Sequence, residues 1–115
     1  MRDYNPEIQK LFLEMMLQDA ETFVRVQNIF NYENFDRSLR EAAKFIKEHG
    51  SEYKTLPTRD QITATTGIEL KPVPDMIEGH YDWFMTEFEG FSRRQELERA
   101  ILKAADMIEN GEYDP

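Results

Sequence analysis

Apolar residues near the start of the chain recur every three or four positions, which is the spacing of one face of an α-helix. In this segment they are Ile8, Leu11, Phe12, Met15 and Met16. Asn5 precedes them as an N-cap residue, and Pro6 occupies a first helical position, which tolerates proline. The pattern therefore predicts a first helix that ends near Gln18.

Two more helices are predicted in the first half of the chain. Asp19 is suited to cap a short second helix, and residues 28–34 are expected to form a turn region. A third helix is expected to begin around Asp36 and to end at Gly50, because glycine commonly ends helices. The residues of this helix that are expected to face the core are Leu39, Ala42, Ala43 and Ile46.

A short fourth helix is predicted from the residues at its two ends. Thr58 and Gln61 have the spacing of a capping box, and Gly67 is suited to close the helix. Residues 1–67 are therefore expected to form a helical bundle. Two prolines within residues 68–76 exclude regular helix there and favour an extended connector.

Residues 77–115 carry two apolar stripes at helical spacing. The first consists of Ile77, Tyr81, Phe84, Phe88 and Phe91, and the second of Leu97, Ile101, Ala104 and Ile108. A polar run at residues 92–96 separates the stripes, so either one long helix changes its buried face or two helices meet near Gly90. The sequence thus predicts an all-α fold, a small helical bundle followed by a long C-terminal helix or helix pair, within one structural domain overall.

Charge and composition restrict the partners of this 115-residue chain. Its formal net charge of -9 repels a phosphate backbone, so we expect no direct binding of nucleic acid and favour a basic protein surface as partner. No apolar stretch approaches the roughly 20 residues that a membrane span needs, so no membrane partner is expected. The polar N-terminus lacks the apolar core of a secretory signal, and the chain has no cysteine. A cytoplasmic location fits these features.

Residues that usually carry catalysis or metal binding are sparse. His49 and His80 are the only imidazoles, and neither has a second ligand at the short spacing of a helical metal motif. The sequence has no glycine-rich phosphate loop, and no serine lies in a nucleophile motif. The rings around Phe88 could stack on bases, but the neighbouring Glu87 and Glu89 favour core packing instead. We therefore expect no catalytic site, no metal and no cofactor.

The second apolar stripe is the best candidate for a binding surface. It consists of Leu97, Ile101, Ala104 and Ile108, which share one side of a helix. The small Ala104 lets a second helix approach closely, and the connector at residues 68–76 separates this stripe from the bundle. We expect the stripe to contact another protein chain, most simply a second copy. Arg94, Glu98 and Asp106 are expected on the opposite, solvated side.

Several segments resemble the N-terminal domain of DnaB-family replicative helicases. Residues 8–19 are similar to the first helix of that domain, and the large apolar residues that follow at matching places are Phe23, Val26 and Phe35. Residues 56–62 look like the phage-type form of the segment that opens the next helix. Residues 99–108 and the final Tyr113-Asp114-Pro115 are similar to a helix of the family that ends in the same three residues. The connector and residues 77–91 have no close counterpart in the common bacterial pattern, so the phage type is the closer match.

The resemblance implies both a fold and a function. In that family the domain is a small helical bundle plus the first helix of a hairpin, and copies associate into a collar above the ATPase ring. By resemblance, this chain is the non-catalytic N-terminal collar domain of a replicative DNA helicase, which mediates oligomer assembly and docks primase or a helicase loader. Residues 99–108 would belong to the hairpin helix. The alternative that the residues leave open is a free-standing acidic helical adaptor or regulatory protein, such as a phage-encoded one.

Overall fold

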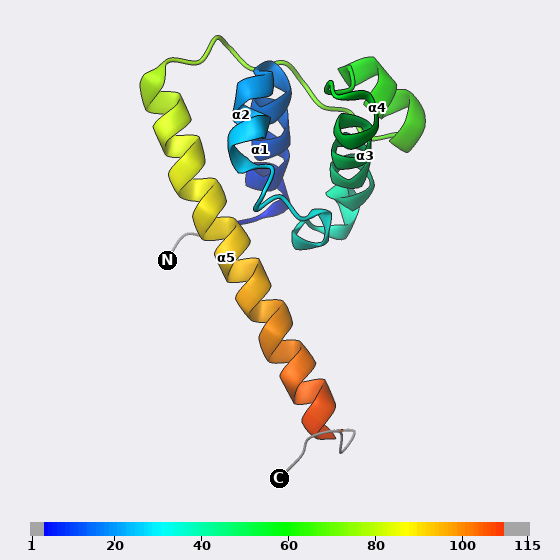
Figure 1. Ribbon diagram of the computed structural model, residues 1–115, viewed down its shortest axis with the longest axis vertical. Coiled ribbons are helices and arrows are strands. Elements are labelled where there is room, and N and C mark those ends of the chain that lie inside the picture. Colours follow the sequence, from blue (N-terminus) through cyan, green and yellow to red (C-terminus); the bar gives the residue numbers. More distant parts are fainter. Residues whose placement is uncertain (1–3, 110–115) are drawn as a thin grey trace.

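Helices are the only regular secondary structure within residues 4–109, which are the residues that the computed structural model describes (Figure 1). Their bounds are α1 Pro6–Gln18, α2 Ala20–Val26, the 3-10 helix η1 Tyr32–Asn34, α3 Arg37–Tyr53, α4 Arg59–Thr66 and α5 Glu78–Glu109. The elements before α5 form a bundle, and α5 runs along one side of this bundle and continues past it. The predicted all-α fold is confirmed.

Side-chain caps start the helices where the sequence predicts them. At the start of α1, the Asn5 Oδ1 atom accepts a hydrogen bond of 3.0 Å from the Ile8 backbone N–H. Asp19 caps α2 in a similar way. At the start of α4, Thr58 and Gln61 form a complete capping box, in which each side chain accepts from the other residue's backbone N–H. Each cap satisfies an amide that has no partner within its own helix.

The prediction that the third helix ends at Gly50 is wrong. The helix α3 continues to Tyr53, and Lys54 is the residue that takes the left-handed conformation, with a φ of 57°. The Lys54 N–H donates to the Gly50 carbonyl oxygen at 3.1 Å, so Gly50 lies inside the last turn. The rings of His49 and Tyr53 pack across this turn, with centroids 4.7 Å apart. A glycine ends a helix only where its own φ becomes positive, and local sequence does not dictate that for Gly50.

The core forms around α1, which contacts α2, α3 and α5. Phe12 of α1 is fully buried, and its ring centroid lies 5.9 Å from that of Phe84, 5.5 Å from that of Phe88 and 5.5 Å from that of Phe91. These three α5 rings are also fully buried, so they pack in the core as predicted. Ile77 does not join them, because it precedes the first turn of α5 and is 67% exposed.

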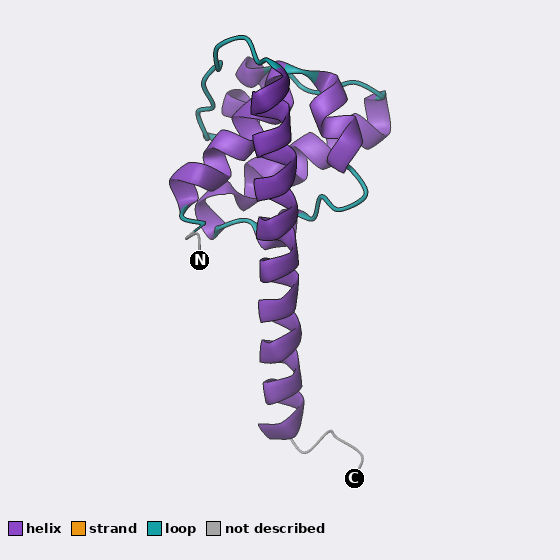
Figure 2. Cartoon of the chain, turned by 90° about the vertical axis from the view of Figure 1, so that its left-hand side faces the viewer, coloured by secondary structure: helices purple, strands orange, loops and turns teal. Residues whose placement is uncertain are grey.

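A single continuous helix of 32 residues, α5, spans the region where the sequence leaves two alternatives open. Its first half packs on the bundle, and its second half projects beyond the bundle as a stalk (Figure 2). We call residues 93–109 the stalk. At Gly90 the chain near the N-terminus passes close by, because a Cβ atom there would lie 2.7 Å from the Tyr4 hydroxyl oxygen. Gly90 therefore provides room for Tyr4 and does not break the helix.

Candidate protein-interaction surface

The stalk exposes the four apolar residues that the sequence predicts as an interaction surface. Leu97 is 61% exposed, Ile101 59% and Ile108 62%, and the small Ala104 is exposed between them. We call Leu97, Ile101, Ala104 and Ile108 the outer stripe. A contiguous apolar strip of this kind on a folded domain commonly marks a binding site. The function of the outer stripe in binding stays a prediction.

Two polar contacts fix the rotation of the stalk about its axis. The Gln95 side-chain amide donates to the Asn34 carbonyl oxygen at 2.8 Å, and the Arg99 guanidinium donates to the Asn34 Oδ1 atom at 2.7 Å. Gln95 and Arg99 therefore face the bundle. Leu97 and Ile101 follow these two residues by two positions each, which is about 200° around an α-helix. The outer stripe thus points away from the bundle of its own chain.

Arg94, Glu98 and Asp106 are all exposed as expected, but only Asp106 lies opposite the outer stripe. Arg94 and Glu98 each precede a residue of the outer stripe by three positions, so they flank the stripe. Both line one surface depression together with Leu97 and Ile101. Asp106 is two positions from both Ala104 and Ile108, and it lies on the opposite side as expected. Residues three apart share one side of a helix, so the expectation that Arg94 and Glu98 lie opposite the stripe was wrong.

Leu102 is an exposed apolar residue that lies outside the outer stripe. Leu102 is 66% exposed. It follows Arg99 by three positions, so it lies on the side of α5 that faces the bundle in the N-terminal half of the helix. Residues 101–109 are all exposed, and this part of α5 projects beyond the bundle, which leaves this side of the helix open (Figure 1). Leu102 therefore has the same size as Leu97 and a similar exposure, but it lies on another side of α5.

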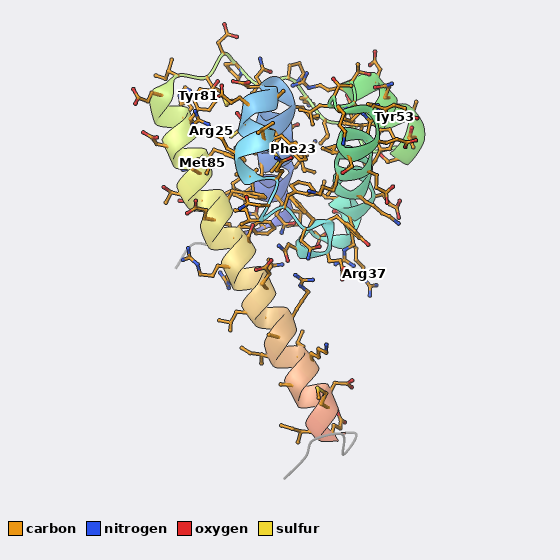
Figure 3. The ribbon with its side chains drawn as sticks, viewed as in Figure 1. Phe23, Arg25, Arg37, Tyr53, Tyr81 and Met85 are labelled. Atoms are coloured by element: carbon orange, nitrogen blue, oxygen red, sulfur yellow. The ribbon has the colours of Figure 1, made fainter. Side chains whose placement is uncertain are left out.

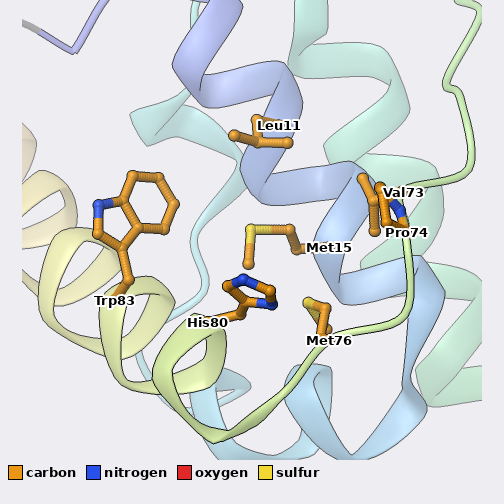
Figure 4. A pocket seen from close by; sticks show the side chains of 7 residues that line it. All are labelled: Leu11, Met15, Val73, Pro74, Met76, His80 and Trp83. Atoms are coloured by element: carbon orange, nitrogen blue, oxygen red, sulfur yellow. The ribbon is translucent and has the colours of Figure 1, made fainter.

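A second apolar surface lies at the other end of α5, in a groove that the sequence does not predict (Figure 4). The groove has a volume of about 380 Å³ and lies between α1, the connector and the first turns of α5. Its lining residues are Leu11, Met15, Val73, Pro74, Met76, His80 and Trp83. We call this site the groove. Methionine and tryptophan provide a deformable and a flat apolar surface, respectively, and both are frequent at protein-binding sites.

The connector forms one wall of the groove because it is fixed to α1. The Glu14 Oε2 atom accepts a hydrogen bond of 2.7 Å from the Lys71 backbone N–H, and Glu14 itself is only 9% exposed. Leu70 next to it is 4% exposed and belongs to the core. Val73 precedes Pro74 and Met76 follows it, and both side chains are partly buried against the core. Their apolar character, like that of Leu70, was the signal in the sequence that this connector is more than a spacer.

A hydrogen bond between α5 and the α1–α2 junction fixes the start of α5 beside the groove. The Tyr81 hydroxyl donates to the Asp19 Oδ2 atom at 2.8 Å. This hydrogen bond, together with partial burial and the nearby negative charges, raises the pKa of Tyr81 above its usual value of 10.0. Tyr81 and Arg25 line the same depression at this end of the molecule (Figure 3).

Each of the two histidines has a backbone partner at its Nδ1 atom. The His49 Nδ1 atom lies 2.8 Å from the Thr55 carbonyl oxygen, and the His80 Nδ1 atom accepts from the Ile77 backbone N–H at 3.2 Å. Within residues 4–109, no group of three or more His, Asp or Glu side chains is placed to hold a metal ion. In the same residues, no helix has the length and apolar character that would span a membrane.

Comparison of the chain with protein-family models, with curated proteins and with solved structures finds no match. A functional proposal therefore depends on two surfaces of the chain itself, which are the outer stripe and the groove.

Proposed function

We propose that this chain is the non-catalytic N-terminal collar domain of a phage-type, DnaB-family replicative helicase. In this function it assembles with further copies and docks a primase or a helicase loader. The observation that carries the proposal is the outer stripe, which lies on a projecting helix and faces away from its own bundle. A bundle with one projecting helix also agrees with the architecture that the sequence resemblance implies.

The direction of the outer stripe favours association between chains over folding back. Its large residues are held on the far side of α5 by the contacts of Gln95 and Arg99 with Asn34. Covering the stripe with the helices of its own bundle would require α5 to rotate and would break these two hydrogen bonds. A second copy covers the stripe without any such change.

The energy available from the outer stripe alone is modest. Complete burial of an exposed Leu or Ile side chain contributes about 1.5–3 kcal/mol, so three residues that are roughly 60% exposed contribute about 3–5 kcal/mol together. Association of two proteins costs at least about 4 kcal/mol in lost freedom of motion. A stable assembly therefore needs further contacts, which a collar supplies because each chain has two neighbours.

The net charge of the chain agrees with a protein-binding function. A charge of -9 opposes contact with the phosphate backbone, whereas it attracts a basic protein surface. This supports a domain that organises other proteins at a replication fork and leaves the DNA contacts to other parts of the machine.

Two measurements test the proposed function. Gel filtration with light scattering over a range of concentrations is expected to give a mass that is a multiple of 13.7 kDa and that falls on dilution. A monomer at the highest soluble concentration would contradict self-assembly. The reading frame beyond codon 115 is expected to encode a linker and then a phosphate loop of an ATPase, and a stop codon directly after Pro115 would favour the free-standing adaptor instead.

A further inference from the structure

We infer that the groove receives the outer stripe of a second copy, so that chains associate head to tail. This inference rests on the proposed self-association and specifies its contact. The groove and the outer stripe are two different surfaces on one chain, and each chain offers both. A contact between two different surfaces repeats from chain to chain, which builds rings or filaments rather than a closed pair.

The contact cannot form within one chain. The groove includes Trp83, and the outer stripe includes Ile101, eighteen residues further along the same continuous helix. At 1.5 Å per residue, these two positions are about 27 Å apart along the axis of α5. A stripe of one chain therefore reaches only the groove of another.

The size of the groove suits two neighbouring side chains of the stripe. Leu97 and Ile101 are four positions apart and stand next to each other on the helix surface. An apolar cavity of about 150 Å³ holds a molecule the size of benzene, so a groove of about 380 Å³ has room for two such side chains. Met76 and Trp83 in the groove wall then provide the additional apolar area that the outer stripe lacks.

The charges around the two surfaces are complementary. Residues 72–83, which form the connector side and the α5 side of the groove, include Asp75, Glu78 and Asp82 but no Lys or Arg. All three carboxylates are exposed. On the stalk, Arg93, Arg94 and Glu98 line the surface around Leu97 and Ile101, so two cations there face one anion. Negative charge beside an apolar groove and positive charge beside an apolar stripe favour this pairing and its orientation.

Charge disfavours one symmetrical alternative, in which two stalks pair side by side and parallel through their outer stripes. In a parallel pair, the Arg93 and Arg94 side chains of both chains would approach one another. In an antiparallel pair, Arg93 and Arg94 would lie near the acidic end of the partner's stalk around Glu109, so charge permits this pairing, and the variants below distinguish it from the head-to-tail contact. The head-to-tail contact places these arginines near carboxylates.

Single substitutions in the full chain separate the two surfaces. Ile101→Glu disables the stripe, and Met76→Glu disables the groove by placing a charge on its wall. Ile77→Glu is the matched control, because it adds the same charge at the position next to Met76. Ile77 is 67% exposed and does not line the groove. By light scattering, the first two variants are expected to be monomers of 13.7 kDa, and the control is expected to associate like the parent.

Mixing the two disabled variants gives the decisive result. The Ile101→Glu chain keeps its groove and the Met76→Glu chain keeps its stripe, so an equimolar mixture is expected to form one contact and to double the mass. Raising the salt concentration is expected to weaken this pair, because the arginine and carboxylate charges are screened. Circular dichroism checks that each variant is folded, and Val73→Glu replaces Met76→Glu as the groove variant if the latter unfolds.

The outcomes distinguish this inference from the proposed function. If Met76→Glu associates like the parent and the mixture gains no mass, the stripes pair with each other, and the head-to-tail contact is wrong while self-assembly stands. If the parent itself is a monomer at every concentration, both proposals are wrong. Because the chain has no cysteine, Ile101→Cys and Met76→Cys variants give an independent check. Under mild oxidation, the mixture is expected to form the disulfide-linked heterodimer in preference to either homodimer.

Discussion

The Phe12 ring of α1 meets the Phe88 ring of α5 edge to face, with centroids 5.5 Å apart and an interplanar angle of 88°. This contact is at the centre of the aromatic core, and both rings are fully buried. Because Phe88 must face α1, the rotation of the whole helix α5 is determined. The outer stripe, further along the same helix, then faces away from the bundle. Core packing and the exposure of the outer stripe thus have one cause.

Replacement of Phe12 by alanine tests the central place of this residue. Phe12→Ala removes the ring that contacts three α5 phenylalanines and leaves a cavity, so we expect the free energy of unfolding to fall by about 3–5 kcal/mol. Denaturant unfolding followed by circular dichroism measures this loss. Val24→Ala on the exposed side of α2 is the control, with an expected change within about 0.5 kcal/mol. A similar small change for Phe12→Ala would contradict the packing.

Gly67 is expected to tolerate substitution poorly. It closes α4 with a φ of 77°, a conformation that costs a residue with a Cβ atom about 1–2 kcal/mol. Gly67→Ala should therefore lower the free energy of unfolding by about 1 kcal/mol, and Gly67→Asn should lower it less. Gly79→Ala in α5, where a Cβ atom meets nothing within 4 Å, should be neutral or stabilising. A Gly67→Ala variant as stable as the parent would show that α4 ends differently.

The hydrogen bond from Tyr81 to Asp19 predicts a pH dependence on the alkaline side. The pKa of Tyr81 is raised in the folded chain, so the neutral phenol stabilises the fold below the unfolded value of 10.0. This stabilisation is lost as the pH rises through the folded pKa, because the phenolate cannot donate to the carboxylate. The difference in unfolding free energy between the parent and Tyr81→Phe should therefore be positive at about pH 8 and should shrink above pH 10. A difference that is independent of pH would contradict this contact.

Duplex DNA should not bind the chain appreciably at physiological salt. The net charge of -9 leaves few cationic side chains to displace the counterions of the phosphate backbone. A fluorescence anisotropy titration with labelled duplex checks this expectation. Micromolar affinity with a steep dependence on salt would contradict this expectation. It would also contradict the proposal that the chain binds proteins and leaves DNA to other domains.

The sequence was a good guide to features that depend on neighbouring residues. The N-caps Asn5 and Asp19, the capping box of α4 and the burial of Phe88 all follow from spacing and local chemistry. The end of α3 was missed, because the choice between Gly50 and Lys54 as the left-handed residue is not made by composition alone.

The groove could not be predicted from the sequence, for a different reason. Leu11, Val73 and Trp83 come from three segments that are far apart in the chain, and only the docking of the connector on α1 brings them together. The hydrogen bond between Glu14 and Lys71 that holds the connector involves a backbone amide, which leaves no trace in the sequence. The exposure of Leu97 and Ile101 was predictable from periodicity, but their direction depends on the contacts of Gln95 and Arg99 with Asn34.

A comparison of Ile101→Glu with Leu102→Glu tests the central claim most directly, which is that the outer stripe carries self-association. The two residues are adjacent, are 59% and 66% exposed, and differ mainly in the side of α5 that they occupy. Glutamate is a good helix former, so both variants should keep the helical signal of the parent in circular dichroism. Light scattering after gel filtration is expected to show Ile101→Glu as a monomer and Leu102→Glu at the mass of the parent. Equal masses for the two variants, whether both associated or both monomeric, would contradict the account.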